Sequence, residues 1–295
     1  MKNIYLLLAL FAVLISSCSD DKLDSESIFD TNPPARNEFD TWLLNNYVKT
    51  YNVDFKYRYD DKESDMTYNL APATYSQSVA LAKLTKFLWF EAYDELLGVS
   101  FMRTNAPRLF QLIGSPAYNT QGSIVLGTAE GGLKVLLYNV NIINVDNPRI
   151  EELNYWFFKT MHHEFTHILN QKKAYTTDFN TISTDYQSDS WVNIGDWERS
   201  GNTQCLNMGF VSSYASRDPG EDFAEIVSIY VTHNEAYWSN LLNNADASGK
   251  AKIGKKFDIV KDYLLTSWNI EIDDLRTIVQ RRSGEIGSLD LKNLN

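Results

Sequence analysis

The chain has 295 residues, of which 44% are apolar, 13% aromatic and 22% charged. This composition supports a sizeable hydrophobic core and excludes a chain that is disordered over most of its length. The 27 basic and 38 acidic residues give a formal net charge of −11, and no run of Lys or Arg exceeds two residues. Such a surface would repel a polyanion, so nucleic acid is not expected as a partner.

Residues 1–17 are predicted to be a secretion signal. They carry one basic residue, Lys2, and an apolar run over residues 4–15 that is too short to be a spanning helix. The segment ISSC, which ends at Cys18, resembles a bacterial lipobox. The resemblance implies cleavage before Cys18 and lipidation of this cysteine, whereas an ordinary signal peptide with an incidental cysteine is the alternative.

The segment CSDD, which starts at Cys18, also resembles the acidic export tag of surface lipoproteins in Bacteroidota. It implies an outer-membrane anchor on the cell surface, with a periplasm-facing location as the alternative. Residues 18–36 are rich in Asp, Ser and Pro and are predicted to form a flexible tether. Only Cys205 remains as a second cysteine, so no disulfide is expected, and its predicted role is a small buried hydrophobe.

Residues 37–295 show no further linker or repeat and are expected to form one domain. Their apolar spacing predicts a helix around residues 39–47, a half-buried strand over 53–59 and a long helix over 76–97. Strands are expected at 108–113, 122–127 and 133–140, followed by helices from about 148 to 282. This order predicts an α+β fold with a mixed sheet and a mostly helical C-terminal part.

Three of the four histidines lie in the segment MHHEFTH, residues 161–167. On a helix, His163 and His167 project from one face, and their nitrogens can converge on one ion. Glu164 lies about 100° round the helix from His163 and can reach a water bound to that ion. This HExxH pattern is typical of zinc hydrolases. A buried helix whose histidines are paired with carboxylates is the structural alternative.

A catalytic zinc site needs a third protein ligand. The metzincin pattern is excluded, because Asn170 and Lys173 occupy the positions that would need Gly and His. Downstream, the segment DPGEDFAE, residues 218–225, begins with a helix-start signal and places Glu221 and Glu225 on one helix face. One of them can bind the ion while the other accepts a hydrogen bond from a ligating imidazole. His233 is a further, more distant candidate ligand.

The segments HHEFTH and YASRDPGEDFAE resemble the gluzincin metallopeptidases. The spacing Tyr-x₆-Glu-x₃-Glu is similar to that of the anthrax lethal factor-like and Pro-Pro endopeptidases. The wider sequence looks like the zinc-binding metallopeptidase lipoproteins of Bacteroidota. The resemblance implies a zincin-like fold and a Zn²⁺ cofactor bound by His163, His167 and Glu221. It also implies that Glu225 contacts a ligand of the ion instead of the ion itself, and that Tyr214 stabilises the transition state.

In zincins, an edge strand upstream of the HExxH helix usually binds the peptide substrate in antiparallel fashion. The resemblance therefore makes Leu133 to Val140 a candidate, with Leu133, Val135 and Leu137 as substrate-strand residues. An ordinary core strand is the alternative for this segment.

The sequence predicts a zinc metallopeptidase that hydrolyses peptide or protein substrates, with Glu164 as general base and Tyr214 as oxyanion donor. The alternative is a non-catalytic surface lipoprotein that holds glycan or peptide for an outer-membrane nutrient-uptake complex. A retained Glu164 argues against this alternative, because a binding protein has no need for the base.

Overall fold

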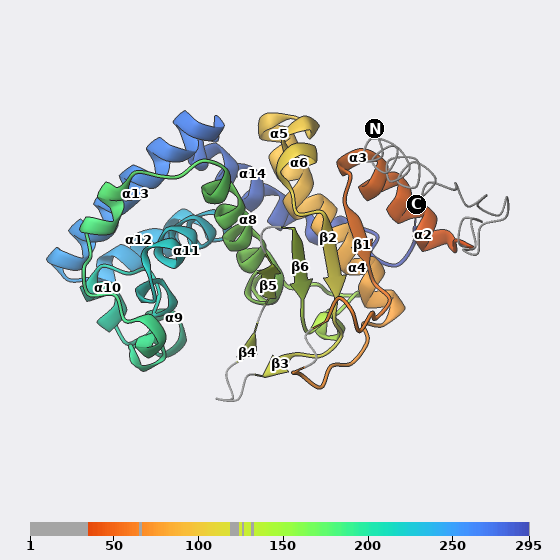
Figure 1. The fold of residues 1–295 in the computed structure, drawn as a ribbon, viewed down its shortest axis with the longest axis horizontal. Coiled ribbons are helices and arrows are strands. Elements are labelled where there is room, and N and C mark those ends of the chain that lie inside the picture. Colours follow the sequence, from red (N-terminus) through yellow and green to blue (C-terminus); the bar gives the residue numbers. More distant parts are fainter. Residues whose placement is uncertain (1–34, 65–66, 119–123, 126, 131–132, 295) are drawn as a thin grey trace, which may run out of the picture. The chain divides into compact units, whose positions relative to one another are not determined.

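The computed structural model describes residues 35–64, 67–118, 124–125, 127–130 and 133–294 (Figure 1). One compact unit comprises Asn37–Asn295. The predicted signal peptide, Cys18 and nearly all of the predicted tether lie outside the described residues. Among the residues described, no helix is both long and apolar enough to cross a membrane.

The unit begins with a helix, as the sequence predicts. Asn37 caps α2 (Glu38–Leu43): its side chain accepts from the backbone N–H of Asp40, and the Asp40 carboxylate accepts from the N–H of Asn37. The helix continues through a π-helical turn and α3 (Lys49–Tyr51). Strand β1 (Asp54–Lys56) follows and is shorter than predicted.

The main sheet has four strands in the order β1-β2-β6-β5. Strand β2 (Leu109–Leu112) pairs in parallel with β1 and with β6 (Lys134–Leu137), whereas β5 (Gly127–Glu130) pairs antiparallel to β6. The mixed sheet and the α+β class are thus confirmed. A second, two-stranded sheet joins β3 (Ala117–Tyr118) to β4 (Ile124–Val125).

The prediction that residues 133–140 form an edge strand for the substrate is wrong. Val135 and Leu137 belong to β6, which is paired on both sides, so its backbone N–H and C=O groups are already used. Leu133 lies in the turn before β6 and is 65% exposed. In the described part of the sheet, the strand with a single neighbour on this side is β5, so the available edge belongs to the preceding strand.

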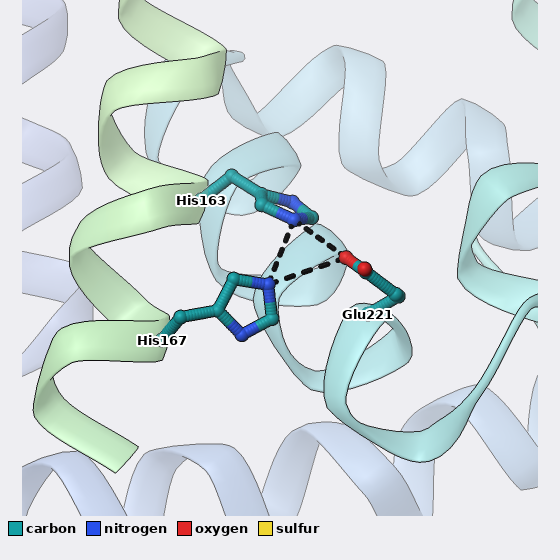
Figure 2. A group of neighbouring side chains, drawn as sticks. All are labelled: His163, His167 and Glu221. Atoms are coloured by element: carbon teal, nitrogen blue, oxygen red, sulfur yellow. Dashed lines mark hydrogen bonds and ion pairs between the residues drawn. The ribbon is translucent and has the colours of Figure 1, made fainter. Parts of the chain in front are cut away.

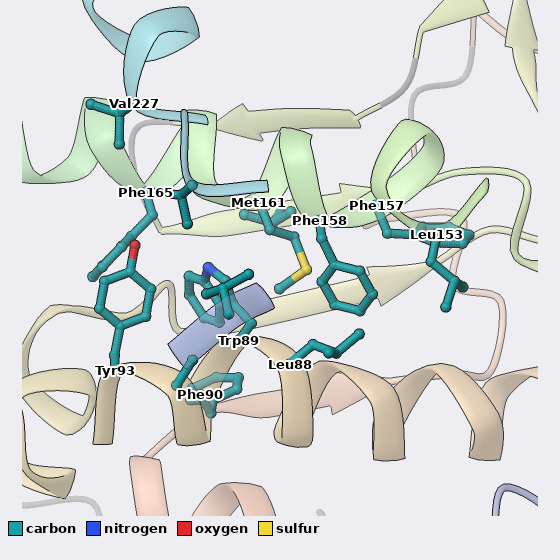
Figure 3. Close-up of a cluster of buried hydrophobic side chains, with 14 of the residues drawn as sticks. Leu88, Trp89, Phe90, Tyr93, Leu153, Phe157, Phe158, Met161, Phe165 and Val227 are labelled. Carbon is teal, nitrogen blue, oxygen red and sulfur yellow. The ribbon is translucent and has the colours of Figure 1, made fainter. Parts of the chain in front are cut away.

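A long helical run, as predicted for residues 76–97, covers the sheet: α4 (Tyr75–Thr85), a π-helical turn and α5 (Glu91–Leu97). The short helix α6 (Val99–Asn105) follows. Figure 3 shows that the apolar residues of this run face those of the helix that carries the histidines. Trp89 and Phe165 form an edge contact with ring centroids 5.2 Å apart. Burying each such ring stabilises the fold by about 2 kcal/mol or more, which fixes the histidine-bearing helix on the core.

The second half of the unit is helical, as predicted. The histidines lie in a run that combines α7 (Ile150–Leu153), a π-helical turn (Asn154–Phe158) and α8 (Lys159–Lys172). Helix α11 (Pro219–Thr232) packs against α8. The remaining helices are α9 (Trp197–Ser200), α10 (Gln204–Met208), α12 (Glu235–Asn244), α13 (Ala247–Trp268) and α14 (Ile272–Glu285).

Candidate metal centre

Helix α8 holds the two histidines of the HExxH pattern. Met161, Phe165 and Leu169 are buried on its core side, and this packing turns His163 and His167 toward α11. Figure 2 shows both imidazoles projecting from α8 toward one point. The helical spacing of four residues brings the rings within 4.8 Å of each other, centroid to centroid.

Helix α11 supplies the carboxylate. The Asp218 side chain accepts hydrogen bonds from the N–H groups of Gly220 (2.9 Å) and Glu221 (3.1 Å), and Pro219 occupies the first turn. The predicted helix start is therefore confirmed. Because the cap fixes the first turn, it also fixes the position from which Glu221 reaches the two imidazoles (Figure 2).

Three donor atoms converge. Glu221 Oε2 lies 2.8 Å from His163 Nε2 and 3.2 Å from His167 Nε2, and the two Nε2 atoms are 3.1 Å apart. A tetrahedral zinc ion with ligands at about 2.05 Å requires donor atoms separated by about 3.3 Å. The observed triangle has nearly this size. Among the described residues, these three form the group whose donor atoms could hold a metal ion.

The electrostatics of the triangle favour a cation. Burial lowers the pKa of His163, but hydrogen bonds to Glu221 and Glu225 outweigh burial and raise this pKa to about 9. Burial raises the pKa of Glu221, yet the two imidazoles hold it well below its usual value. The donors thus stabilise positive charge at their centre, and the mixed imidazole and carboxylate set is one that zinc accepts.

The second glutamate of α11 orients His163 from behind. His163 Nδ1 donates to Glu225 Oε1 at 3.0 Å, which leaves Nε2 as the ring nitrogen that faces the convergence point and would bind an ion there. Ser212 Oγ donates to Glu225 Oε2 at 2.6 Å, and Lys159 Nζ lies 3.0 Å from the same oxygen. Glu225 is buried, and this complete set of partners holds its carboxylate in one orientation.

Glu164 and Tyr214 lie beside the triangle. Glu164 is half-buried, and burial raises the pKa of its carboxyl against the opposing influence of His163 and His167. The Tyr214 ring lies 5.8 Å from the His163 ring, centroid to centroid. Arg217 Nη1 donates to the Tyr214 hydroxyl oxygen at 3.2 Å, so the hydroxyl can still donate its own proton.

A family of proteins described as "Putative zinc-binding metallo-peptidase" matches residues 32–273, most of the chain. The chain belongs to this family. The predicted resemblance of the wider sequence to zinc-binding metallopeptidases is thereby confirmed. The family description and the His/His/Glu donor set both indicate zinc as the cofactor.

The same relationship is visible in a solved structure. The chain is similar to a protein described as a putative zinc-binding metallo-peptidase from Bacteroides caccae, with 42% sequence identity and a TM-score of 0.75. The similarity covers 91% of this chain and 100% of that chain. None of the curated proteins matches the chain.

The remaining histidines and Cys205 lie outside the triangle. His162 is fully buried, and its Nδ1 lies 3.0 Å from the Tyr93 hydroxyl. His233 faces Glu198, at 3.6 Å, instead of the triangle, so it is not brought to the metal centre as a third ligand. Cys205 is buried and free, as predicted, and burial raises the pKa of its thiol to about 11.

The sequence reasoning missed Lys159, Ser212 and Arg217. Lys159 precedes His163 by four residues on α8, a spacing that puts both side chains on one face and could have revealed it. Arg217 directly follows the short helical turn Tyr214–Ser216, and Ser212 lies two residues before that turn. Nothing in the local pattern distinguishes Ser212 from its neighbour Ser213, because its contact to Glu225 depends on how this loop packs against α11.

Proposed function

We propose that this protein is a zincin-like peptidase that hydrolyses peptide bonds, with His163, His167 and Glu221 as the ligands of zinc. The observation that supports this best is the convergence of these three donors immediately beside Glu164. Zinc bound there would acidify a coordinated water and polarise the substrate carbonyl.

Glu164 acts as general base in this proposal. It takes a proton from the attacking water and later transfers that proton to the leaving amine. Its raised pKa, caused by burial, suits both steps, because the carboxyl can hold the proton between them. Tyr214 donates a hydrogen bond to the oxyanion, while Arg217 fixes the hydroxyl oxygen from the other side.

Metal removal tests the proposed function. We expect purified protein to contain zinc and to cleave peptides from a proteome-derived library. A chelator should abolish cleavage, and added zinc should restore it, because the water-activating ion is lost and regained. Cleavage is read by mass spectrometry of the products, and zinc by elemental analysis.

Two results would contradict the proposed peptidase function. If protein loaded with zinc leaves a broad peptide library intact, hydrolysis is excluded and the alternative of a non-catalytic binding lipoprotein gains support. Cleavage that persists after verified removal of the metal would equally contradict the proposal, since the chemistry assigned to the triangle requires the ion.

Replacing Tyr214 with Phe should lower kcat by about 100-fold and leave zinc content and KM nearly unchanged, because the lost hydroxyl acts on the transition state. Steady-state kinetics and elemental analysis measure these values. Tyr118→Phe, which changes an exposed tyrosine on β3, is the matched control and should behave like the wild type. A wild-type kcat in the Tyr214 variant would remove the residue from the mechanism.

We also propose that the protein is lipid-anchored to the outer membrane through Cys18, facing the cell exterior. Cys18→Ala should abolish lipid attachment and release the protein into the soluble fraction, because a lipid anchor is the membrane attachment proposed. Fractionation and mass measurement of the mature protein test this. Retention of the variant in the membrane would contradict the anchor.

The proposed export signal for the cell surface is tested separately with Asp20 and Asp21 changed to Ala and Cys18 kept. Accessibility of the protein to external protease should fall, while membrane association stays the same. If protease accessibility and membrane association both remain unchanged, the two aspartates are not the export signal.

A further inference from the structure

A cavity of about 590 Å³ adjoins the metal centre. Tyr214 and Glu225 belong both to its lining and to the surroundings of the metal ligands. Its volume lies in the range of about 300–1,000 Å³ that is typical of ligand pockets. A peptide held with its scissile carbonyl at the metal centre would therefore have this space next to it.

The lining combines polar groups and aromatic rings. Asn154 contributes a polar side chain from the π-helical turn before α8, and Gln280 and Ser283 contribute polar side chains from α14. Ser283 is 9% exposed, and its hydroxyl has no hydrogen-bond partner among the described residues. Tyr155 and Tyr237 add aromatic carbon along which the methylene groups of a long side chain can pack. A long side chain with a polar end fits this lining better than a short apolar one.

The charges in the cavity are unbalanced. Glu225 and Lys159 neutralise each other at 3.0 Å. Asp196 accepts from the backbone N–H groups of Arg199 (3.1 Å) and Ser213 (2.8 Å), which leaves its charge in place. Glu198 adds a further carboxylate, so negative charge remains around a single lysine that is already paired.

Glu198 is the carboxylate best placed to meet a ligand. Its side chain is 41% exposed, and its ion-pair partner, His233, is 3.6 Å away, so the carboxylate remains accessible to a ligand. Burial raises the pKa of Glu198, but His233 and the Lys159 charge lower it below its usual value, so the group is ionised at neutral pH. Arg199, the other cation of the lining, is exposed and forms none of the ion pairs described.

We propose that this cavity is a specificity pocket for a Lys or Arg side chain of the substrate, next to the scissile bond, with Glu198 as the carboxylate that pairs with it. This inference rests on the proposed peptidase function. An acidic side chain would approach Glu198 and Asp196 and be repelled. A substrate α-ammonium group would leave most of the volume unused, which favours the longer cationic side chain.

Matched peptides that differ only in Arg or its neutral isostere citrulline, placed in turn at each position near the cleaved bond, test the pocket. At one position we expect kcat/KM of the wild type to be about 10- to 100-fold higher for Arg, because a charge-assisted hydrogen bond is lost with citrulline. Glu198→Gln should bring this ratio close to one, chiefly by lowering the rate on the Arg peptides. Glu198→Lys should favour Glu over Gln at the same position.

Glu152→Gln is the matched control. It also removes one negative charge, in this case from α7, which contributes Glu151 to the lining. Glu152 itself is not a lining residue, so the wild-type ratio should be kept. N-acetylated versions of the peptides separate a side-chain pocket from one for the α-ammonium group: acetylation should not affect cleavage. A requirement for the free terminus would overturn the proposal.

Equal kcat/KM for Arg and citrulline at every position, or an unchanged ratio in Glu198→Gln, would also overturn it. Failure of the peptidase function is distinguishable, because the zinc-loaded protein would then cleave none of the peptides. In that case isothermal titration with the same peptide pairs decides about the pocket. Tighter binding of the Arg peptide that depends on Glu198 supports it, and equal binding of both rejects it.

Discussion

Glu164→Gln should lower kcat/KM for peptide hydrolysis by about 100-fold or more, while zinc remains bound in a near-stoichiometric amount. Glutamine keeps the size of the side chain and its helix propensity but cannot take a proton from water. Glu164 is not one of the three converging donors, so its loss should leave the ligand set intact. Steady-state kinetics and elemental analysis on the same preparation measure both effects.

Glu152→Gln provides the control for this change as well. Glu152 lies eleven residues before His163 in the same helical run, about 16 Å along the helix axis, and should leave both activity and zinc content unchanged. Wild-type activity in Glu164→Gln would refute the general-base assignment. A loss of zinc together with activity would instead make Glu164 a structural part of the metal site.

The two glutamates of α11 should give different phenotypes. Glu221→Ala should lose zinc readily and be inactive, because it removes a direct ligand from a set of three. Glu225→Ala should still take up zinc but bind it about 10- to 100-fold more weakly, because Glu225 only orients His163 through Nδ1. Competition with a chromogenic zinc chelator measures both affinities.

Removal of Glu225 also leaves Lys159 without its ion-pair partner, which can destabilise the fold on its own. Glu225→Gln is therefore the companion variant: it keeps the hydrogen-bonding capacity toward Ser212 and removes the charge. Thermal unfolding of each variant without metal separates folding from affinity. If Glu225 variants lose zinc completely and Glu221 variants keep it, the ligand role passes to Glu225, and the Tyr214 assignment, which depends on its spacing from Glu221, fails.

The helical parts of the site could be predicted because their geometry is local. Four residues make roughly one turn, so the spacing of His163 and His167 alone puts both rings on one face. Asp218 and Pro219 indicate the start of α11 by an equally local pattern. The apolar periodicity of residues 76–97 likewise depends only on near neighbours, and the observed helix follows it.

The pairing of the strands in the sheet could not be predicted in this way. The strands predicted at 122–127 and 133–140 contain β4 and β6 but only the first residue of β5. Strands β5 and β6 are neighbours in the chain, whereas the pairing of β6 with β2 joins segments that are distant along it. Both the edge and the interior position are compatible with the same short apolar pattern. The interior place of Val135 and Leu137 was therefore decided by the long-range pairing of β6 with β2.

The sequence by itself determined the HExxH helix, the acidic start of α11, the α+β class and the family. The tertiary structure decided which glutamate faces which atom: Glu221 and Glu225 share a helix face, and only the packing of α11 against α8 brings one to Nε2 and the other to Nδ1 of His163. It also decided the contacts of Lys159 and Ser212 and the cavity at Glu198. These features depend on residues far apart in the chain, whose distances no local periodicity encodes.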